Sequence, residues 1–404
     1  MTRIWPIAVG VFMIMLPVTA VVPLLYELTE GRFPGRADLD RHLFMSANMA
    51  GSLVMALTAG LWSDRIGARK ALIVPGLFAF SLLLFLMYLP FPYPIQLSLR
   101  FLEGGAHMAV LVLAMTLVAD IAPDNRKGRS LGLVGASMSL GVATGSVLGG
   151  RIDPNQATQL FLYGGFLMLA LAFVATWVIK DAPIRSAAER LPVMLRLLAQ
   201  QHKLGIPYLF TFIDRLTVGF IISTVSLYFA TVLSLSPAQI GLAMATFLLP
   251  FGALTYPAGL LCERVSPIAL MSVGSVLYGC YLIALGFGGA DQILMIMAFG
   301  GVVAALMLAP SIILTSQLAG DEQQATAMGG FHLAGSLGFM LGPMLGVGGM
   351  ATLKAFGLDP YPGIFVVVGS LEIICVLALL PWLLKVHARR ATHQEVLAAQ
   401  GDQY

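Results

Sequence analysis

The sequence predicts an all-α integral membrane protein in which twelve transmembrane helices form two pseudo-symmetric six-helix bundles around a central cavity. The first observation is composition: of 404 residues, 58% are hydrophobic and only 11% are charged, whereas a soluble domain carries about 25% charged residues. The second is a series of twelve apolar runs, each near the roughly 20 residues that a helix needs to cross a bilayer. The third is that motifs of the first half recur in the second.

The apolar runs give the expected spans. In the first half they are residues 4–27, 42–62, 70–90, 94–119, 130–150 and 158–179. In the second half they are residues 206–233, 238–260, 267–288, 292–316, 325–350 and 362–384. Proline inside these runs, such as Pro17 and Pro250, is compatible with membrane helices because neighbouring helices can satisfy the freed backbone groups.

Positive charge gives the expected orientation. If the N-terminus is cytoplasmic, most of the 23 Lys and Arg residues fall on the cytoplasmic side, and the opposite loops hold only Arg32, Arg36, Arg41, Arg151 and Lys354. This bias fits the positive-inside rule. We therefore expect a multi-pass protein of the cell inner membrane with both termini in the cytoplasm.

The longest cytoplasmic connection divides the chain. We expect an N-terminal bundle of residues 1–184, a cytoplasmic linker of 185–204, a C-terminal bundle of 205–386 and a cytoplasmic tail of 387–404. Within the connection, residues 191–200 are amphipathic, so this stretch either lies along the membrane surface or only tethers the halves.

Two motifs repeat between the halves. Residues 60–65, GLWSDR, correspond to 259–264, GLLCER, and residues 141–149, GVATGSVLG, correspond to 338–346, GFMLGPMLG. Because both pairs are separated by nearly the same length of chain, they indicate an internal duplication. Transporters are commonly built from such repeats, with the substrate site at the repeat interface near the bilayer midplane.

Several function classes are excluded. The net charge is only +3, with no basic run interleaved with aromatic residues, so nucleic acid is not an expected partner. Cys262, Cys280 and Cys375 lack CxxC spacing, so no metal or cofactor is expected. The sequence has no P-loop for ATP and no HExxH or GxSxG motif in a suitable context, so we do not expect an enzyme.

The loop after the second span reads GLWSDRIGARK from Gly60 to Lys70. Gly60 permits close approach of two helices, and Gly67 permits a tight turn. The motif resembles the G-x-L-x-D-R-x-G-R-[KR] signature of the major facilitator superfamily. The resemblance implies a cytoplasmic gate formed by Gly60, Asp64, Arg65, Gly67, Arg69, Lys70 and Asp120. In this gate Asp64 would face the positive start of span eleven, and Arg65 would reach Asp120 at the foot of span four. The alternative is a charge cluster that only sets the membrane orientation. Such a cluster would explain the basic residues but not the spacing of Gly60, Asp64 and Gly67.

Span five ends with the glycines Gly141, Gly145, Gly149 and Gly150. This pattern resembles the G-x3-G-P-x2-G-G signature of the superfamily's twelve-span drug:proton antiporters, except that Ser146 replaces the usual proline. Span eleven carries Gly342, Pro343 and Gly346. Small residues four apart let another helix pack closely; such packing also occurs in membrane bundles generally.

Span four carries Arg100, Glu103 and His107 at i, i+3 and i+7, which share one helix face. Residues 100–104, RFLEG, resemble the R-x2-[Q/E]-G signature that the superfamily carries on this span. Charged groups deep in a bilayer cost at least about 2.5 kcal/mol and usually face a cavity or each other. Glu103 is thus the first candidate for a proton-coupling site, and the alternative is a static Arg100–Glu103 pair that orders the helix.

Span seven carries Asp214 and Arg215, which point about 100° apart on a helix and cannot share a face. The family's topology makes spans one, four, seven and ten line the cavity, so Asp214 is the second proton-coupling candidate. Arg215 is then its counter-ion or an anchor for an anionic substrate, and the alternative is a pair that joins span seven to its neighbours. For Glu372 we expect a hydrogen-bonded packing role because span twelve is peripheral, and His332 is either a hydrogen-bonded packing residue or a proton relay.

The resemblance implies a secondary active transporter, and we expect proton-coupled export of a small, largely apolar organic compound by alternating access. Expected partners are this substrate, protons and the lipid bilayer, and the protein is expected to be a monomer. Alternatives are an importer or uniporter of a metabolite or organic anion, a (lyso)lipid transporter, or a transport-dead membrane sensor. Residues considered for the substrate site are Tyr26, Tyr228, Phe247, Tyr256 and Gln317.

Overall fold

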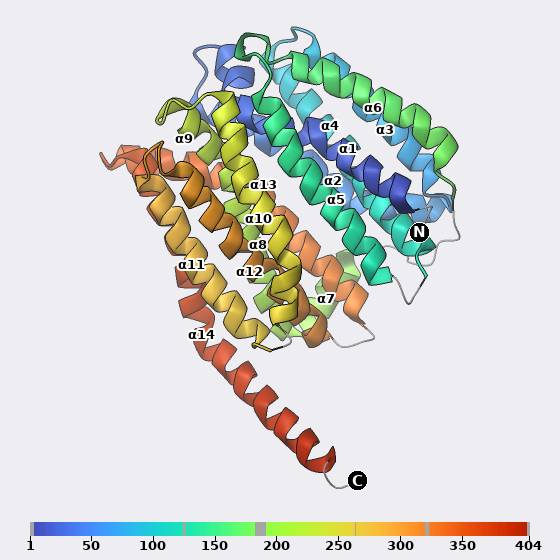
Figure 1. The fold of residues 1–404 in the computed structure, drawn as a ribbon, viewed down its shortest axis with the longest axis vertical. Helices are drawn as coiled ribbons and strands as arrows, with labels where there is room; N and C mark the ends of the chain where they lie inside the picture. The colour runs from blue at the N-terminus through green and yellow to red at the C-terminus, as the bar shows by residue number, and fades with distance from the viewer. Residues whose placement is uncertain (1–3, 124–126, 182–190, 263, 320–322, 402–404) are drawn as a thin grey trace.

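The computed structural model describes residues 4–123, 127–181, 191–262, 264–319 and 323–401. They form a bundle of helices (Figure 1). Within these ranges, twelve helical segments are long and apolar enough to cross a membrane. The all-α membrane fold with twelve spans is thus confirmed.

Each expected apolar run corresponds to a span. The first half contains α1 (Ile4–Ala20) with the turns η1 (Val22–Leu24) and η2 (Glu27–Gly31), α2 (Asp38–Ile66), α3 (Lys70–Tyr88), α4 (Tyr93–Ile121), α5 (Lys127–Gly150), η4 (Pro154–Gln156) and α6 (Gln159–Val178). The second half contains η5 (His202–Leu204), α8 (Gly205–Phe220), η6 (Ile221–Val225) and α9 (Ser226–Thr231), which together form one span, and then α10 (Pro237–Leu261), α11 (Pro267–Phe287), α12 (Ile293–Ala319), α13 (Gln324–Ala355) and α14 (Pro360–Gly401).

The amphipathic stretch between the halves is the helix α7 (Leu191–Gln200). It packs against α13, where Gly329 leaves space for the Met194 side chain. Leu197 is buried, whereas Val193 and Leu195 are exposed. The helix therefore does more than tether the halves, because it contacts the second half directly.

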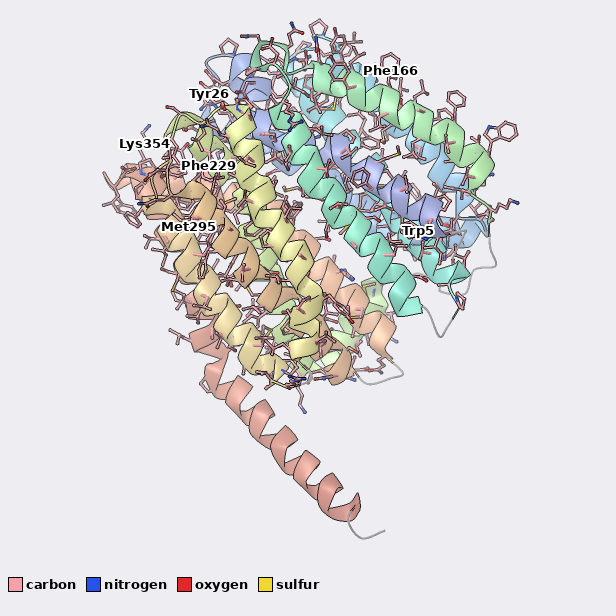
Figure 2. All side chains as sticks on the ribbon, viewed as in Figure 1. Trp5, Tyr26, Phe166, Phe229, Met295 and Lys354 are labelled. Atoms are coloured by element: carbon pink, nitrogen blue, oxygen red, sulfur yellow. The ribbon has the colours of Figure 1, made fainter. Side chains whose placement is uncertain are left out.

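The outer surface of the bundle is apolar. Trp5, Phe166 and Met295 point outward from the ribbon in Figure 2 and are 55%, 59% and 72% exposed. Large apolar side chains distributed in this way over a surface match a lipid environment, because water would disfavour their exposure.

The halves meet through two pairs of helices, α5 with α10 and α2 with α13. Polar contacts also join the halves at the end of the bundle that lies away from the 66–70 loop. This end contains residues 22–42 and 224–237, and we call it the opposite end. There Nε2 of His42 lies 3.2 Å from Oγ1 of Thr224, and the Ser226 hydroxyl donates to the Val22 carbonyl at 2.6 Å. Thr224 lies in the π-helical turn η6.

Candidate functional site

The loop between α2 and α3 folds as its glycine predicts. Gly67 ends α2 with φ of 77°, in the left-handed region that a residue without Cβ adopts readily, and its N–H donates to the Ser63 carbonyl at 3.0 Å. Behind this turn lies Arg69, which is only 1% exposed. Its Nε lies 3.1 Å from Oδ2 of Asp120 on α4, and its Nη1 pairs with Asp64.

The prediction that Arg65 contacts Asp120 is wrong. Arg69 makes that contact, whereas Arg65 is exposed. The reason is the turn at Gly67, which reverses the chain and returns residue 69 beneath α2. The expected approach of Asp64 to the start of span eleven involves residues 320–322, which lie outside the described residues.

Further hydrogen bonds tie this loop to α2 and to the end of α6. The Ser63 hydroxyl accepts from Nη1 of Arg69 at 3.1 Å. Lys70 donates from Nζ to the Thr176 carbonyl at 2.6 Å and from its backbone N–H to Asp181 at 2.7 Å. The loop therefore links the ends of α2, α3, α4 and α6.

The charged residues of α4 form a buried cluster with α2. Oε2 of Glu103 accepts hydrogen bonds from Nη1 of Arg100 and from Nδ2 of Asn48, both at 2.6 Å. Glu103 is 0% exposed and Arg100 is 1% exposed. The helices approach closely because Gly51 and Gly104 pack against the backbone of the facing helix, and Asn48 is a partner that the spacing within α4 could not reveal.

The second oxygen of Glu103 differs from the first. Among the described residues, Oε1 has no hydrogen-bond partner and lies 3.9 Å from Nδ1 of His107. The His107 ring also packs near Phe80 of α3, with 5.9 Å between ring centroids. Arg100, Glu103 and His107 thus come together as their spacing predicts, in the interior of the first half between α2, α3 and α4.

Asp214 and Arg215 are adjacent on α8, and the charge of Arg215 acts on Asp214. Thr217 donates to Oε1 of Glu372 on α14 at 3.5 Å, so this side of α8 faces α14. Asp214 lies one turn earlier on nearly the same side, and its charge acts on Glu372 and on Tyr278 of α11. Arg215 is about 200° around the helix from Thr217.

The structure gives Glu372 a partner that the sequence did not indicate. Glu372 is 1% exposed and accepts a hydrogen bond from Thr217, in keeping with the expected hydrogen-bonded packing role, and the charge of Asp214 acts on it as well. Among the described residues, no Lys or Arg nitrogen lies within ion-pair distance of either carboxylate. The described part of the second half therefore contains two neighbouring acidic groups that form no ion pair with Lys or Arg.

Within each half, the motif glycines pack one helix closely against another, and the paired helices are equivalent in the two halves. Four of them lie so close to a carbonyl of the facing helix that a Cβ would clash: Gly141 with Phe12, Gly145 with Leu16, Gly338 with Phe212 and Gly342 with Leu216. Gly149 and Gly346 continue the two contacts, against Ala20 and Thr224, while Gly150 lies against Pro237 of α10. Pro343 lies within α13. The repeated motif is thus a repeated packing surface, α5 on α1 and α13 on α8.

The residues considered for substrate contact occupy different environments. Tyr228 and Phe247 are 4% and 5% exposed and pack in aromatic clusters of the second half. Tyr26 is partly buried beneath Arg41, whereas Tyr256 and Gln317 are exposed. They do not form one cluster.

No group of three or more metal-binding side chains occurs in the described ranges. Twelve spans in two helix-paired halves, with charged residues buried inside the membrane region, instead define the class of polytopic membrane transporters.

The family follows from comparison with known proteins. Residues 7–200 and 208–400 match the model of the Major Facilitator Superfamily, and the chain belongs to this family of secondary transporters. The fold resembles that of a mutant of the nucleoside transporter NupG, with a TM-score of 0.80 and 11% identity over 94% of this chain and 99% of that one.

Three relatives of this chain have names that refer to different compounds. The Gallate transporter of Pseudomonas putida is 31% identical over 40% of this chain and 36% of its own length. The 3-(3-hydroxy-phenyl)propionate transporter of Escherichia coli is 27% identical over 74% of this chain and 75% of its own. Multidrug resistance protein 2 of Bacillus subtilis is 31% identical over 32% of each chain. The chain thus spans about a third of the length of the gallate transporter and of the multidrug protein, and three quarters of the length of the propionate transporter.

Proposed function

We propose that this protein couples the export of a small, largely apolar organic compound to the entry of protons. The observation that carries the proposal is the acidic pair of the second half, Asp214 and Glu372. Glu372 is almost fully buried, and neither carboxylate has an ion-pair partner among the described residues. Two acidic groups in apolar surroundings repel each other when both are charged, so the pair can hold a proton.

Glu103 is the corresponding candidate in the first half. Its Oε2 is held by Arg100 and Asn48, while Oε1 lies near His107. A proton could reach Oε1 or the imidazole without breaking the contacts of Oε2. We assign the primary proton site to Asp214 and Glu372 because, among the described residues, neither carboxylate forms an ion pair, although the charge of the adjacent Arg215 acts on Asp214.

Export is supported by the glycine surface of α5, which packs on α1 as described above, and by the relatives whose names refer to multidrug resistance. Uptake of an organic anion is the second candidate. It is favoured by the aromatic-acid transporters among the relatives and by Arg215, a cation within a span.

The test uses purified protein in liposomes that contain a trapped pH dye. Substrate is added outside, with lipophilic cations and weakly polar drugs in one series and aromatic acids in another. Substrate entry by antiport drives protons out and makes the lumen alkaline, whereas symport makes it acidic. Protein-free liposomes correct for passive permeation, and Asp214→Asn, Glu372→Gln and Glu103→Gln are compared with Asp291→Asn, which removes an exposed carboxylate outside the spans.

An alkaline signal that disappears in Asp214→Asn or Glu372→Gln and persists in Asp291→Asn supports proton-coupled export. An acidic signal with the same mutant pattern supports uptake by symport instead. Substrate movement without any proton signal, at equal rates in all variants, contradicts proton coupling. Binding without movement would indicate a sensor rather than a transporter.

A further inference from the structure

The position of Arg215 is set by the close crossing of α8 and α13. This crossing brings Gly338 and Gly342 against the α8 backbone. One turn earlier on α13 lies Gly335, where a Cβ would be 3.2 Å from Cγ of Arg215. The aliphatic stem of Arg215 thus lies on α13 at a position where the absence of a side chain makes room for it.

Arg215 does not share the face of α8 that meets α14, although its charge acts on the adjacent Asp214. Thr217 faces Glu372 on α14, and Arg215 lies about 200° around the helix from Thr217. The side chain is partly exposed. In the described part of the chain, it has neither a hydrogen bond nor a carboxylate within ion-pair distance. Its charge acts on Asp214, but no direct contact with the described residues occupies the guanidinium.

His332 lies on the same side of α13. It precedes Gly335 by three residues, so the two positions lie above one another on the helix surface. His332 is exposed, and the charge of Arg215 acts on its ring. Arg215 and His332 therefore place a guanidinium and an imidazole at the same α8–α13 crossing, near enough for the charge of one to act on the other.

Arginine presents several N–H donors in a planar fork that matches a carboxylate, and the imidazole can add one more donor. The nearby residues of the crossing, such as Phe212, Leu216 and Phe339, are apolar. A ligand of this region therefore needs an anionic group and an apolar body. Ionisable groups inside a membrane span usually mark a substrate or ion pathway.

We infer that Arg215 and His332 bind the carboxylate of an amphipathic monocarboxylate, such as an aromatic acid. This inference deepens the proposed transport function by naming the substrate class, and it rests on that function. It applies to either direction of movement, since the anion must be held while the cavity changes sides.

The test measures binding of 3-phenylpropionate and of its neutral amide, 3-phenylpropionamide, to the full chain in detergent by calorimetry. A charge-assisted hydrogen bond to Arg215 should make the wild type bind the acid about tenfold more tightly than the amide. In Arg215→Gln this preference should fall to about twofold or less, with amide binding retained. Arg151→Gln, which removes an exposed arginine of a loop, is the matched control.

His332→Phe is the second variant, because it keeps a ring on an exposed position and removes the donor. It should weaken acid binding about threefold and leave amide binding unchanged. It also tests the site if Arg215→Gln does not fold, as judged by size-exclusion chromatography.

Equal binding of acid and amide by the wild type, or no binding of either, overturns the inference. So does an unchanged preference in folded Arg215→Gln or in His332→Phe. The pH-dye assay separates this result from the proposed function: proton flux with neutral drugs and no acid preference leaves coupling intact and removes the anion site. Acid preference that depends on Arg215, without proton flux in any variant, leaves the anion site intact and removes coupling.

Discussion

At the scale of single residues, Arg69 is the centre of the loop between α2 and α3. It is 1% exposed and pairs with Asp64 and Asp120, and removal of one member of a buried ion pair costs about 3–5 kcal/mol. We expect Arg69→Met to lower the thermal unfolding midpoint in detergent by several degrees. Arg65→Met should stay within about 0.5 kcal/mol of wild type, because the side chain is exposed.

Unfolding followed by tryptophan fluorescence at pH 7 measures both variants. Equal losses in Arg69→Met and Arg65→Met would show that the loop is held by general positive charge and not by the contacts of Arg69.

Glu30 gives a prediction for pH dependence outside the spans. The N–H of Gly35 and the guanidinium of Arg41 stabilise the charged carboxylate and lower the pKa of Glu30 from its usual 4.5. A group with a lowered pKa contributes stability above the unfolded value, and this contribution is lost as the pH falls through the folded value. Wild type should therefore unfold at a higher temperature than Glu30→Gln at pH 7, and the difference should decrease below pH 4.5.

Thermal unfolding midpoints across this pH range provide the measurement, with Asp291→Asn as the exposed control. A difference between wild type and Glu30→Gln that stays constant with pH would mean that the side chain contributes through packing alone.

Contacts within one helix could be predicted at the residue scale, and contacts between helices could not. The spacing of Arg100 and Glu103 predicts their pairing, which the structure contains at 2.6 Å. Asn48 and Glu372 depend on which faces of different helices meet, and a single sequence does not determine this. The exchange of Arg65 for Arg69 has a similar cause, because the direction of the chain after Gly67 decides which arginine returns beneath α2.

At the scale of helices, two glycines of α5 allow the effect of close packing on stability to be distinguished from the effect of helix propensity. A Cβ at Gly141 would lie 2.5 Å from the Phe12 carbonyl oxygen, and no atom of a neighbouring element lies within 4 Å of a Cβ at Gly132 of the same helix. Overpacking costs about 1–3 kcal/mol, while alanine in an open helix position gains about 0.5–1 kcal/mol over glycine. We expect Gly141→Ala to destabilise the protein and Gly132→Ala to be neutral or stabilising.

Thermal unfolding in detergent measures both substitutions. If Gly141→Ala were as stable as Gly132→Ala, α1 and α5 would have to separate easily, and the glycine surface would not hold them together.

Helix number followed from hydropathy, whereas helix ends did not. Each expected run lies in a span, but α2 begins at Asp38 rather than 42, and α14 continues to Gly401 rather than ending near 384. Hydropathy reports only the part of a helix inside the hydrocarbon layer, and backbone hydrogen bonding extends helices through polar residues beyond it. Figure 1 shows the resulting projection of α14.

At the scale of the whole molecule, the contacts at the opposite end hold the two halves together. His42 of α2 meets Thr224 of η6 at 3.2 Å, and Ser226 donates to Val22. In a transporter whose halves rock against each other, these contacts must separate when the site opens toward that end. We expect a bifunctional thiol reagent to join His42→Cys and Thr224→Cys in a background without the native cysteines, and to reduce substrate flux in liposomes by at least about tenfold, a barrier increase of about 1.4 kcal/mol.

A pair within one half controls for the effect of cross-linking itself. The hydroxyl oxygens of Thr231 and Tyr361, both in the second half, lie 3.3 Å apart. Thr231→Cys with Tyr361→Cys should therefore be joined by the same reagent and leave flux unchanged. A cleavable reagent should restore flux in the first pair when it is reduced, because only the link between the halves blocks the movement. Full flux through protein that is cross-linked between residues 42 and 224 would mean that the halves do not separate at this end, and substrate would then have to move by a route other than alternating access.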